Sequence, residues 1–410
     1  MIEYKNFTLA NGLQVYVHED HSTPMAVMNI LYDVGSRDED PNKTGFAHLF
    51  EHLMFGGSAN IPSYDTPLQK VGGENNAFTS PDLTNYYITL PAENLETAFW
   101  LESDRMMGLS FEQRVLDVQQ KVVIEEFKQR YLNQPYGDVW LKLRPLAYKT
   151  HPYRWATIGK EIAHIENATM NDVKDFFYTY YIPSNAIMVV AGNVKYDEVK
   201  KLSEKWFDPI AAKTKKHRNL PKEQPQTEKR TLKTKASVPM NGIYKTWHIP
   251  ERMHSDYYAI DLFSDILGRG QSSRLYQSLV KDKKMFTSIN AYVTGSIDAG
   301  LFVVEGKMND SISFDKAEAE IDTIIGNTLL HLDENETQKV KNQAEATIVL
   351  SEVELLNRAM NLAFSVNLGD AELINKEGAL IQKVTTESII NTGKKYLTEN
   401  NSSVMYYAKQ

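Results

Sequence analysis

Two segments of this chain, one in each half, repeat the pattern of a helix followed by a buried strand. Residues 167–192 read NATMNDVKDFFYTYYIPSNAIMVVAG, and residues 383–408 read KVTTESIINTGKKYLTENNSSVMYYA. Met188 of the first segment aligns with Met405 of the second. Self-similarity at a long spacing indicates a duplicated unit, here of roughly 200 residues. Chance similarity between two helix–strand patterns is the alternative interpretation.

A second matched pair indicates that the two copies differ in chemistry. The segment HLFEHLMFGGS, which begins at residue 48, has a counterpart in DLFSDILGRGQS, which begins at residue 261. In this alignment the polar residues His48, Glu51 and His52 correspond to Asp261, Ser264 and Asp265. We therefore expect two homologous domains, of which only the first keeps the polar triplet.

The length of 410 residues also favours more than one domain, because a single domain usually contains about 100–200 residues. We predict domains over residues 1–210 and 238–410, joined by a basic, proline-bearing linker over residues 211–237. The basic residues of that segment could instead form a patch for an anionic partner, but its lack of large apolar residues favours a solvated linker. The chain mixes strand signals, such as residues 185–194, with helix signals, such as residues 172–181, and we expect the α+β class.

Composition excludes several classes of function. The chain has no cysteine, which rules out disulfides, thiol catalysis, iron–sulfur clusters and cysteine-ligated zinc. The 53 acidic and 45 basic residues give a net charge of −8, which disfavours nucleic acid as the main partner. No apolar run approaches membrane-spanning length, and the first residues, with Glu3 and Lys5, contain no apolar signal-peptide core. We therefore expect a cytoplasmic protein, or a periplasmic one from which a signal peptide has been removed.

His48, Glu51 and His52 form an H-x-x-E-H motif within a short apolar helix predicted over residues 45–57. Residues four apart share one face of a helix, so both imidazoles can reach one ion, and Glu51 lies beside them. Neutral imidazoles are good zinc ligands, two of them leave coordination positions open, and a nearby carboxylate can take a proton from bound water. A lone histidine on an apolar helix is more often structural, but this triplet favours a metal site.

A catalytic zinc usually has a third protein ligand, and the helix predicted over residues 111–132 offers Glu125 and Glu126. An apolar stripe on this helix is formed by Val115, Val118 and Val122. Glu126 continues the middle of that stripe, and a carboxylate directed into a core needs a partner, so Glu126 is the better candidate ligand. Glu125 at the edge is the alternative. Gln119 shares the Glu126 face and could orient a ligand by hydrogen bonding.

These residues lie in segments that resemble the insulinase/pitrilysin family of zinc peptidases, which includes the mitochondrial processing peptidases. The resemblance covers nearly the whole chain and is carried by the segments NGLQVYVHED, GFAHLFEHLMFGGS, GGENNAFTSPDLTNYY, KVVIEEFKQRYLNQPYG, HPYRWATIG and YIPSNAIMVVAGNV. The inverted H-x-x-E-H motif is typical of that family, and its third ligand, the glutamate that ends a V-V-x-x-E run, matches Glu126. The resemblance implies one zinc ion per chain, held by His48, His52 and Glu126, with Glu51 as the general base that activates a zinc-bound water. It also implies a metalloendopeptidase that hydrolyses peptide bonds of short or unfolded peptides.

The same resemblance implies a fold and a place for the substrate. Each domain would be a mainly antiparallel sheet covered by helices, and the domain pair would build half of a clam-shell chamber that closes around the peptide. In the family the segment N-A-F-T is an exposed edge strand to which the substrate adds, which implies that Asn76 and Ala77 bind substrate. The residues alone leave a loop as the alternative, because Gly72, Gly73 and Asn75 favour turns.

The sequence departs from the family at two places. Gln119 stands where relatives usually carry a second glutamate, so this position supplies no charge. Relatives with a complete site have an arginine and a tyrosine after an S-S-R-L-type segment; the matches here are Val280 and Ser288, and Arg274 and Tyr276 lie too early. We therefore expect a heterodimer in which a homologous subunit supplies the pair, with a homodimer as the alternative. A non-catalytic or weakly active scaffold or peptide-binding subunit is the competing function.

Overall fold

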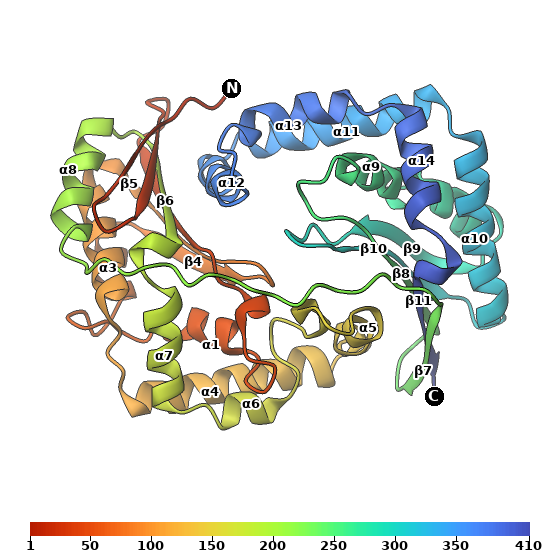
Figure 1. Cartoon of the computed structure of the whole chain (residues 1–410), viewed down its shortest axis with the longest axis horizontal. Helices are drawn as coiled ribbons and strands as arrows, with labels where there is room; N and C mark the ends of the chain where they lie inside the picture. The colour runs from red at the N-terminus through yellow and green to blue at the C-terminus, as the bar shows by residue number, and fades with distance from the viewer. The chain divides into compact units, whose positions relative to one another are not determined.

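A computed structural model describes residues 1–410, which form two compact units (Figure 1). Unit 1 consists of Met1–Arg130, Trp155–Pro221 and Leu350–Asn375, and unit 2 consists of Tyr131–Arg154, Lys222–Val349 and Lys376–Gln410. No helix combines the length with the apolar character that crossing a bilayer requires. Each unit is a sheet with helices packed on it, as predicted.

The sheet of unit 1 has six strands in the order β1-β2-β6-β3-β5-β4. These strands are β1 (Lys5–Thr8), β2 (Gln14–Glu19), β3 (Met25–Tyr32), β4 (Glu74–Thr79), β5 (Thr84–Pro91) and β6 (Ala186–Gly192). Only β2 and β6 pair in parallel, and the other neighbours are antiparallel. Strand β6 lies between β2 and β3 and is buried along its whole length, which explains its continuous apolar sequence. The prediction of a mainly antiparallel sheet is therefore confirmed for this unit.

The α-helices of unit 1 come from all three chain segments that make up the unit. They are α1 (Phe46–Leu53), α2 (Asp65–Lys70), α3 (Leu95–Met107), α4 (Gln113–Phe127), α6 (Ile162–Glu166), α7 (Met170–Tyr180), α8 (Tyr196–Phe207) and α12 (Leu355–Asn367). Helix α4 continues as a π-helix over Lys128–Leu132. Helix α1 packs against both α4 and the edge strand β4, so side chains from three separate segments meet at this helix.

The sheet of unit 2 has five strands in the order β7-β11-β8-β10-β9. They are β7 (Arg230–Ala236), β8 (Gly242–His248), β9 (Phe286–Val293), β10 (Leu301–Met308) and β11 (Ser402–Lys409). The helices of this unit are α5 (Val139–Ala147), α9 (Tyr257–Gly268), a π-helix (Tyr276–Asp282), α10 (Phe314–His331), α11 (Glu334–Ser351) and α14 (Thr386–Tyr396). Helix α13 (Leu373–Gln382) begins in unit 1 and continues in unit 2. Only β7 and β11 pair in parallel, so this sheet is also mainly antiparallel.

The two sheets share one topology, which supports the predicted duplication. Strands β2, β6, β3, β5 and β4 of unit 1 have the same order and relative direction as β7, β11, β8, β10 and β9 of unit 2. The helices that precede the aligned strands begin alike, because the hydroxyl groups of Thr169 and Thr385 each accept a hydrogen bond from the backbone N–H three residues later. Met188 in β6 and Met405 in β11 are both fully buried.

Each unit contains a helix from the other half of the sequence. In unit 1, α12 packs on β3 and β6, where Ala359, Leu362 and Ala363 join the buried cluster. In unit 2, α5 packs on β7, β8 and β11, where Val139 and Leu143 are buried. The compact units are therefore discontinuous in sequence, unlike the contiguous ranges 1–210 and 238–410. An apolar helix face predicts burial but does not say which sheet it will cover.

The basic segment predicted as a linker has two different parts. Lys215 and Arg218, in the part that belongs to unit 1, form ion pairs with Asp33 at 2.6 and 2.9 Å, and Arg218 also pairs with Asp38 at 2.7 Å. The part that belongs to unit 2 ends in β7, which pairs with β11. These basic side chains therefore neutralise acidic residues of the same unit.

Candidate metal centre

Helix α1 carries the H-x-x-E-H motif, and its first turn is held by a buried carboxyl group. Gly45 precedes the helix with a φ of 89°, and a Cβ atom there would lie 2.7 Å from the carbonyl oxygen of Ile158. Glu39 accepts hydrogen bonds from the backbone N–H groups of Gly45 at 3.0 Å and Ala47 at 2.9 Å, and from Trp155 Nε1 at 3.1 Å. Because glycine has no side chain to cap the helix, Glu39 supplies the missing acceptor. Sequence reasoning missed Glu39, since it lies outside the helix.

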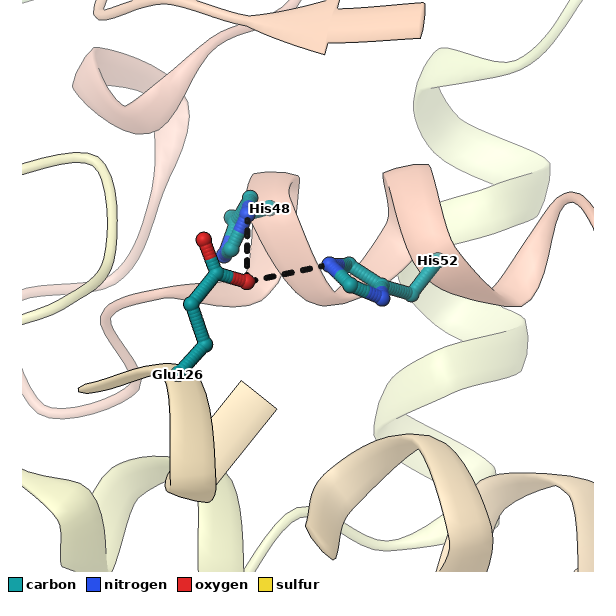
Figure 2. Close-up of side chains that lie close together, drawn as sticks. All are labelled: His48, His52 and Glu126. Carbon is teal, nitrogen blue, oxygen red and sulfur yellow. Dashed lines mark ion pairs between the residues drawn. The ribbon is translucent and has the colours of Figure 1, made fainter. Parts of the chain in front are cut away.

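His48 and His52 on α1 meet Glu126 on α4, as Figure 2 shows. Glu126 Oε2 lies 3.6 Å from His48 Nε2 and 3.4 Å from His52 Nε2. One donor atom from each of the three residues lies within 4.8 Å of the others. Ligand atoms about 2.0–2.1 Å from a tetrahedral zinc ion would stand roughly 3.3 Å apart, so this spacing suits such an ion.

The electrostatic state of the three side chains also fits a divalent cation. Burial lowers the pKa of His48 to about 4, so its imidazole is neutral at pH 7. The hydrogen bond with His52 lowers the pKa of Glu126, which keeps this carboxylate ionised. His48 Nδ1 is buried without a hydrogen-bond partner. No hydrogen bond to Nδ1 therefore forces the imidazole proton onto Nε2, the nitrogen that faces Glu126. Two imidazoles and one carboxylate form a donor set that binds zinc.

Glu51 is not one of the three side chains of the group but lies close enough to interact electrostatically with His52 and Glu126. Its Oε2 atom accepts a hydrogen bond from the hydroxyl group of Thr79 at 2.7 Å. Burial raises the pKa of Glu51, and the Thr79 hydroxyl partly opposes this effect. Thr79 ends the edge strand β4, so this hydrogen bond links the edge strand to the glutamate of the motif. Sequence reasoning did not single out Thr79.

Helix α4 places Glu126 at the site, but the buried face of this helix is not the predicted one. The buried residues of α4 are Leu116, Val123 and Phe127. The prediction that the valine stripe of this helix faces the core is wrong, because Val118 and Val122 are 49% and 44% exposed. Glu126 lies beside the buried face rather than in the middle of it. Glu125 is 59% exposed and pairs with Lys128 at 2.7 Å, away from the imidazoles.

The other predicted site residues have different surroundings. Gln119 is partly buried on α4 and makes no hydrogen bond to His48, His52 or Glu126, so no contact supports its predicted role in orienting a ligand. Asn76 and Ala77 lie in β4, where they pair with β5 on one side only. The strand expected from the family resemblance is thus present, and its outer edge has no neighbouring strand within the sheet.

In unit 2 the residues that the sequence comparison singled out have other partners. Asp265 pairs with Arg269 at 2.9 Å, and Arg269 donates a hydrogen bond to the Thr347 hydroxyl at 2.6 Å. Arg274 is held by Glu336. Val280 packs against the core of the unit.

Comparison with known proteins agrees with these observations. Residues 14–154 match the family model described as "Insulinase (Peptidase family M16)", and residues 167–344 match "Peptidase M16 inactive domain". The zinc protease PqqE of Helicobacter pylori is 33% identical over 329 residues, which cover 78% of this chain and 73% of that protein. The Bacillus subtilis protein named uncharacterized zinc protease YmxG is 25% identical over 391 residues, which cover 89% of this chain and 93% of that protein.

Solved structures with the same fold cover the whole chain. A protease from Helicobacter pylori has a TM-score of 0.94 at 27% identity, with 100% of both chains covered. The structure titled peptidase M16 inactive domain, from Pseudomonas fluorescens, has a TM-score of 0.89 at 17% identity, with 100% of this chain and 98% of that chain covered. The sequence matches, the shared fold and the H-x-x-E-H helix all agree, and the chain therefore belongs to the insulinase family of peptidases, peptidase family M16.

Proposed function

We propose that this chain is a zinc-dependent metalloendopeptidase that hydrolyses peptide bonds of short or unfolded peptides. The observation that carries the proposal is the meeting of His48, His52 and Glu126 around one point, with the carboxylate of Glu51 beside them. His48, His52 and Glu126 would hold one zinc ion. A bound zinc ion supplies Lewis acidity, which lowers the pKa of water and polarises a carbonyl group.

Residues of the chain itself transfer the proton and bind the peptide. Glu51, whose pKa is raised by burial, accepts a proton from the attacking water and passes it to the leaving amine nitrogen. Thr79 holds Oε2 of Glu51, which leaves Oε1 to exchange the proton. The outer edge of β4, at Asn76 and Ala77, binds the peptide as an added strand, because main-chain pairing accepts many sequences. This mode of binding favours extended, unfolded substrates.

A partner subunit is part of the proposal. The positions where relatives carry an arginine and a tyrosine are Val280 and Ser288 here, and Arg274 is engaged by Glu336. We therefore propose that a homologous subunit supplies these groups in a heterodimer, with a homodimer as the second arrangement. We expect the complex in the cytoplasm, or in a periplasm if a leader peptide precedes this chain.

The test combines zinc analysis with peptide hydrolysis on the complex purified from its native cell. We expect one zinc ion per chain and chelator-sensitive cleavage of unstructured peptides. Glu51→Gln should keep the zinc and lower turnover by at least about 100-fold, because it removes the general base. Glu126→Gln should lose zinc, whereas the matched variant Glu125→Gln should retain it. Near-normal hydrolysis by Glu51→Gln would refute the role of that residue, and a zinc-loaded native complex that cleaves nothing would favour a non-catalytic subunit.

A further inference from the structure

The two oxygen atoms of Glu126 have different partners. Oε2 faces the imidazoles of His48 and His52, at 3.6 and 3.4 Å. Oε1 forms an ion pair with Arg130 Nη1 at 2.8 Å. A glutamate side chain can rotate about its terminal bond, which would exchange the two oxygens or turn both away from the imidazoles. The Arg130 contact opposes that rotation, because it holds the oxygen that does not face the histidines.

Arg130 reaches Glu126 from an unusual piece of backbone. Helix α4 ends at Phe127, and the chain continues as a π-helix over Lys128–Leu132, a conformation that occurs often at functional sites. The Arg130 side chain is 70% exposed, and exposed pairs of this kind contribute little to folding stability. The ion pair therefore has little value for the fold, and its structural consequence is the orientation of Glu126.

The same segment offers a matched comparison. Lys128 pairs with Glu125 at 2.7 Å, and both side chains are more than two-fifths exposed. This pair has the same charges, lies in the same turn and comes from neighbouring residues. Glu125, however, has no contact with the imidazoles and is absent from the group of candidate ligands. A change at Lys128 thus reports the effect of losing a positive charge near the site, separately from any effect on Glu126.

We propose that Arg130 is a positioning residue that orients Glu126 for the metal ion, by holding Oε1 and thereby presenting Oε2 to the histidine side of the site. The inference rests on the proposed zinc binding. It assigns to Arg130 the orienting role that the sequence suggested for Gln119, which makes no such contact. Groups that hold a metal ligand in place typically contribute a factor of about 10–100 to metal affinity.

The experiment measures zinc affinity by competition with a chromophoric chelator, on the metal-stripped full-length chain. The variants are Arg130→Ala, Arg130→Lys and the control Lys128→Ala. We expect Arg130→Ala to raise the zinc dissociation constant by about 10–100-fold, Arg130→Lys to recover part of the loss, and Lys128→Ala to match the wild type. The midpoint of thermal unfolding without metal should be nearly the same for all four proteins, because the substituted side chains are exposed.

The outcomes separate this inference from the proposed function. A wild-type chain that binds no zinc would overturn the proposed function itself. A wild-type chain that binds zinc, together with an Arg130→Ala variant of equal affinity, would overturn only the role of Arg130. Equal losses in Arg130→Ala and Lys128→Ala would do the same, because they would indicate a general charge effect. If Arg130→Ala impairs hydrolysis without weakening zinc binding, Arg130 acts on the substrate and the proposal fails.

Discussion

Removing α12 from unit 1 should prevent that unit from folding, although α12 lies more than 140 residues beyond the end of the predicted first domain. The perturbation is a fragment of residues 1–221, which contains every strand of the first sheet but not Leu350–Asn375. In the intact chain α12 covers β3 and β6. The fragment would therefore expose the apolar face of its two central strands to water.

The magnitude follows from the side chains that α12 and its flanks bury. Leu362 and Ile374 are almost completely buried in the cluster that contains Val27 and Val189. Each large aliphatic side chain contributes about 1.5–3 kcal/mol when buried, so these two alone contribute about 3–6 kcal/mol. The uncovered valines of the sheet add to this loss. A domain is typically stable by only about 5–15 kcal/mol, so the loss is comparable to the whole free energy of unfolding.

The assay is urea unfolding, followed by circular dichroism, of two proteins. One is the fragment 1–221, and the other is the same fragment joined by a flexible linker to residues 350–375. Residues 131–154, which belong to unit 2, are present in both and therefore cancel. We expect a cooperative transition only in the second protein. If the fragment alone unfolds cooperatively at the same urea concentration as the linked protein, α12 is a peripheral helix and the reasoning is wrong.

Two further predictions concern buried charges. Glu318 accepts hydrogen bonds from Lys229, Lys245 and Tyr406. Burial opposes its ionisation, but these bonds outweigh burial and lower the pKa of Glu318 to about 2. The ionised carboxylate therefore stabilises the fold above the unfolded pKa of about 4.3, and this stabilisation is lost as the pH falls toward 2. Glu318→Gln should lower the free energy of unfolding by about 2–3 kcal/mol at pH 7. It should also flatten the pH dependence of that free energy between pH 5 and 2, as measured by urea unfolding. In unit 1, Glu102→Gln should cost about 3–5 kcal/mol in the same assay because it leaves the buried guanidinium of Arg105 unpaired, whereas Glu102→Leu combined with Arg105→Met should cost much less. Equal losses in the single and double variants would contradict this account.

Most of the regular elements could be predicted from the sequence because their signals are local. The pattern of apolar residues indicated β6 and α7, and the structure confirms both. Strand β4 is the exception, since its glycine- and asparagine-rich sequence alone favoured a loop. In the structure it pairs with β5 on one side only, and its side chains alternate between exposed and partly buried. Tertiary pairing therefore imposes a strand where local propensity is weak, and only the family resemblance indicated it.

The candidate site was predictable to the extent that it is encoded within one helix. His48, Glu51 and His52 are three and four residues apart, so any helix brings them together. Glu126 lies at the site, but the argument from a buried valine stripe was wrong, because Val118 and Val122 are exposed rather than buried. Glu39 and Thr79 act through hydrogen bonds to residues outside their own elements, which no spacing in the sequence reveals. Arg130 is four residues after Glu126, a spacing at which helical side chains meet, but nothing in the sequence marked that pair as part of the site.

The aligned copy in unit 2 suggests how a fold can dispense with a metal ion. Asp265 stands where the first copy has His52, and its carboxylate is neutralised by Arg269 one turn later. The residue aligned with Arg269 in the first copy is Gly56, where even a Cβ atom would lie 2.4 Å from a methyl group of Val115. A side chain at position 56 would therefore require Val115 to move. A buried polar arc on the first helix of each copy needs a compensating charge, and the second copy obtains it from its own arginine. In the first copy a glycine takes the place of that arginine, and Arg130 pairs with Oε1 of Glu126 rather than with the oxygen that faces the imidazoles. The same physical requirement therefore favours a bound cation on the imidazole side.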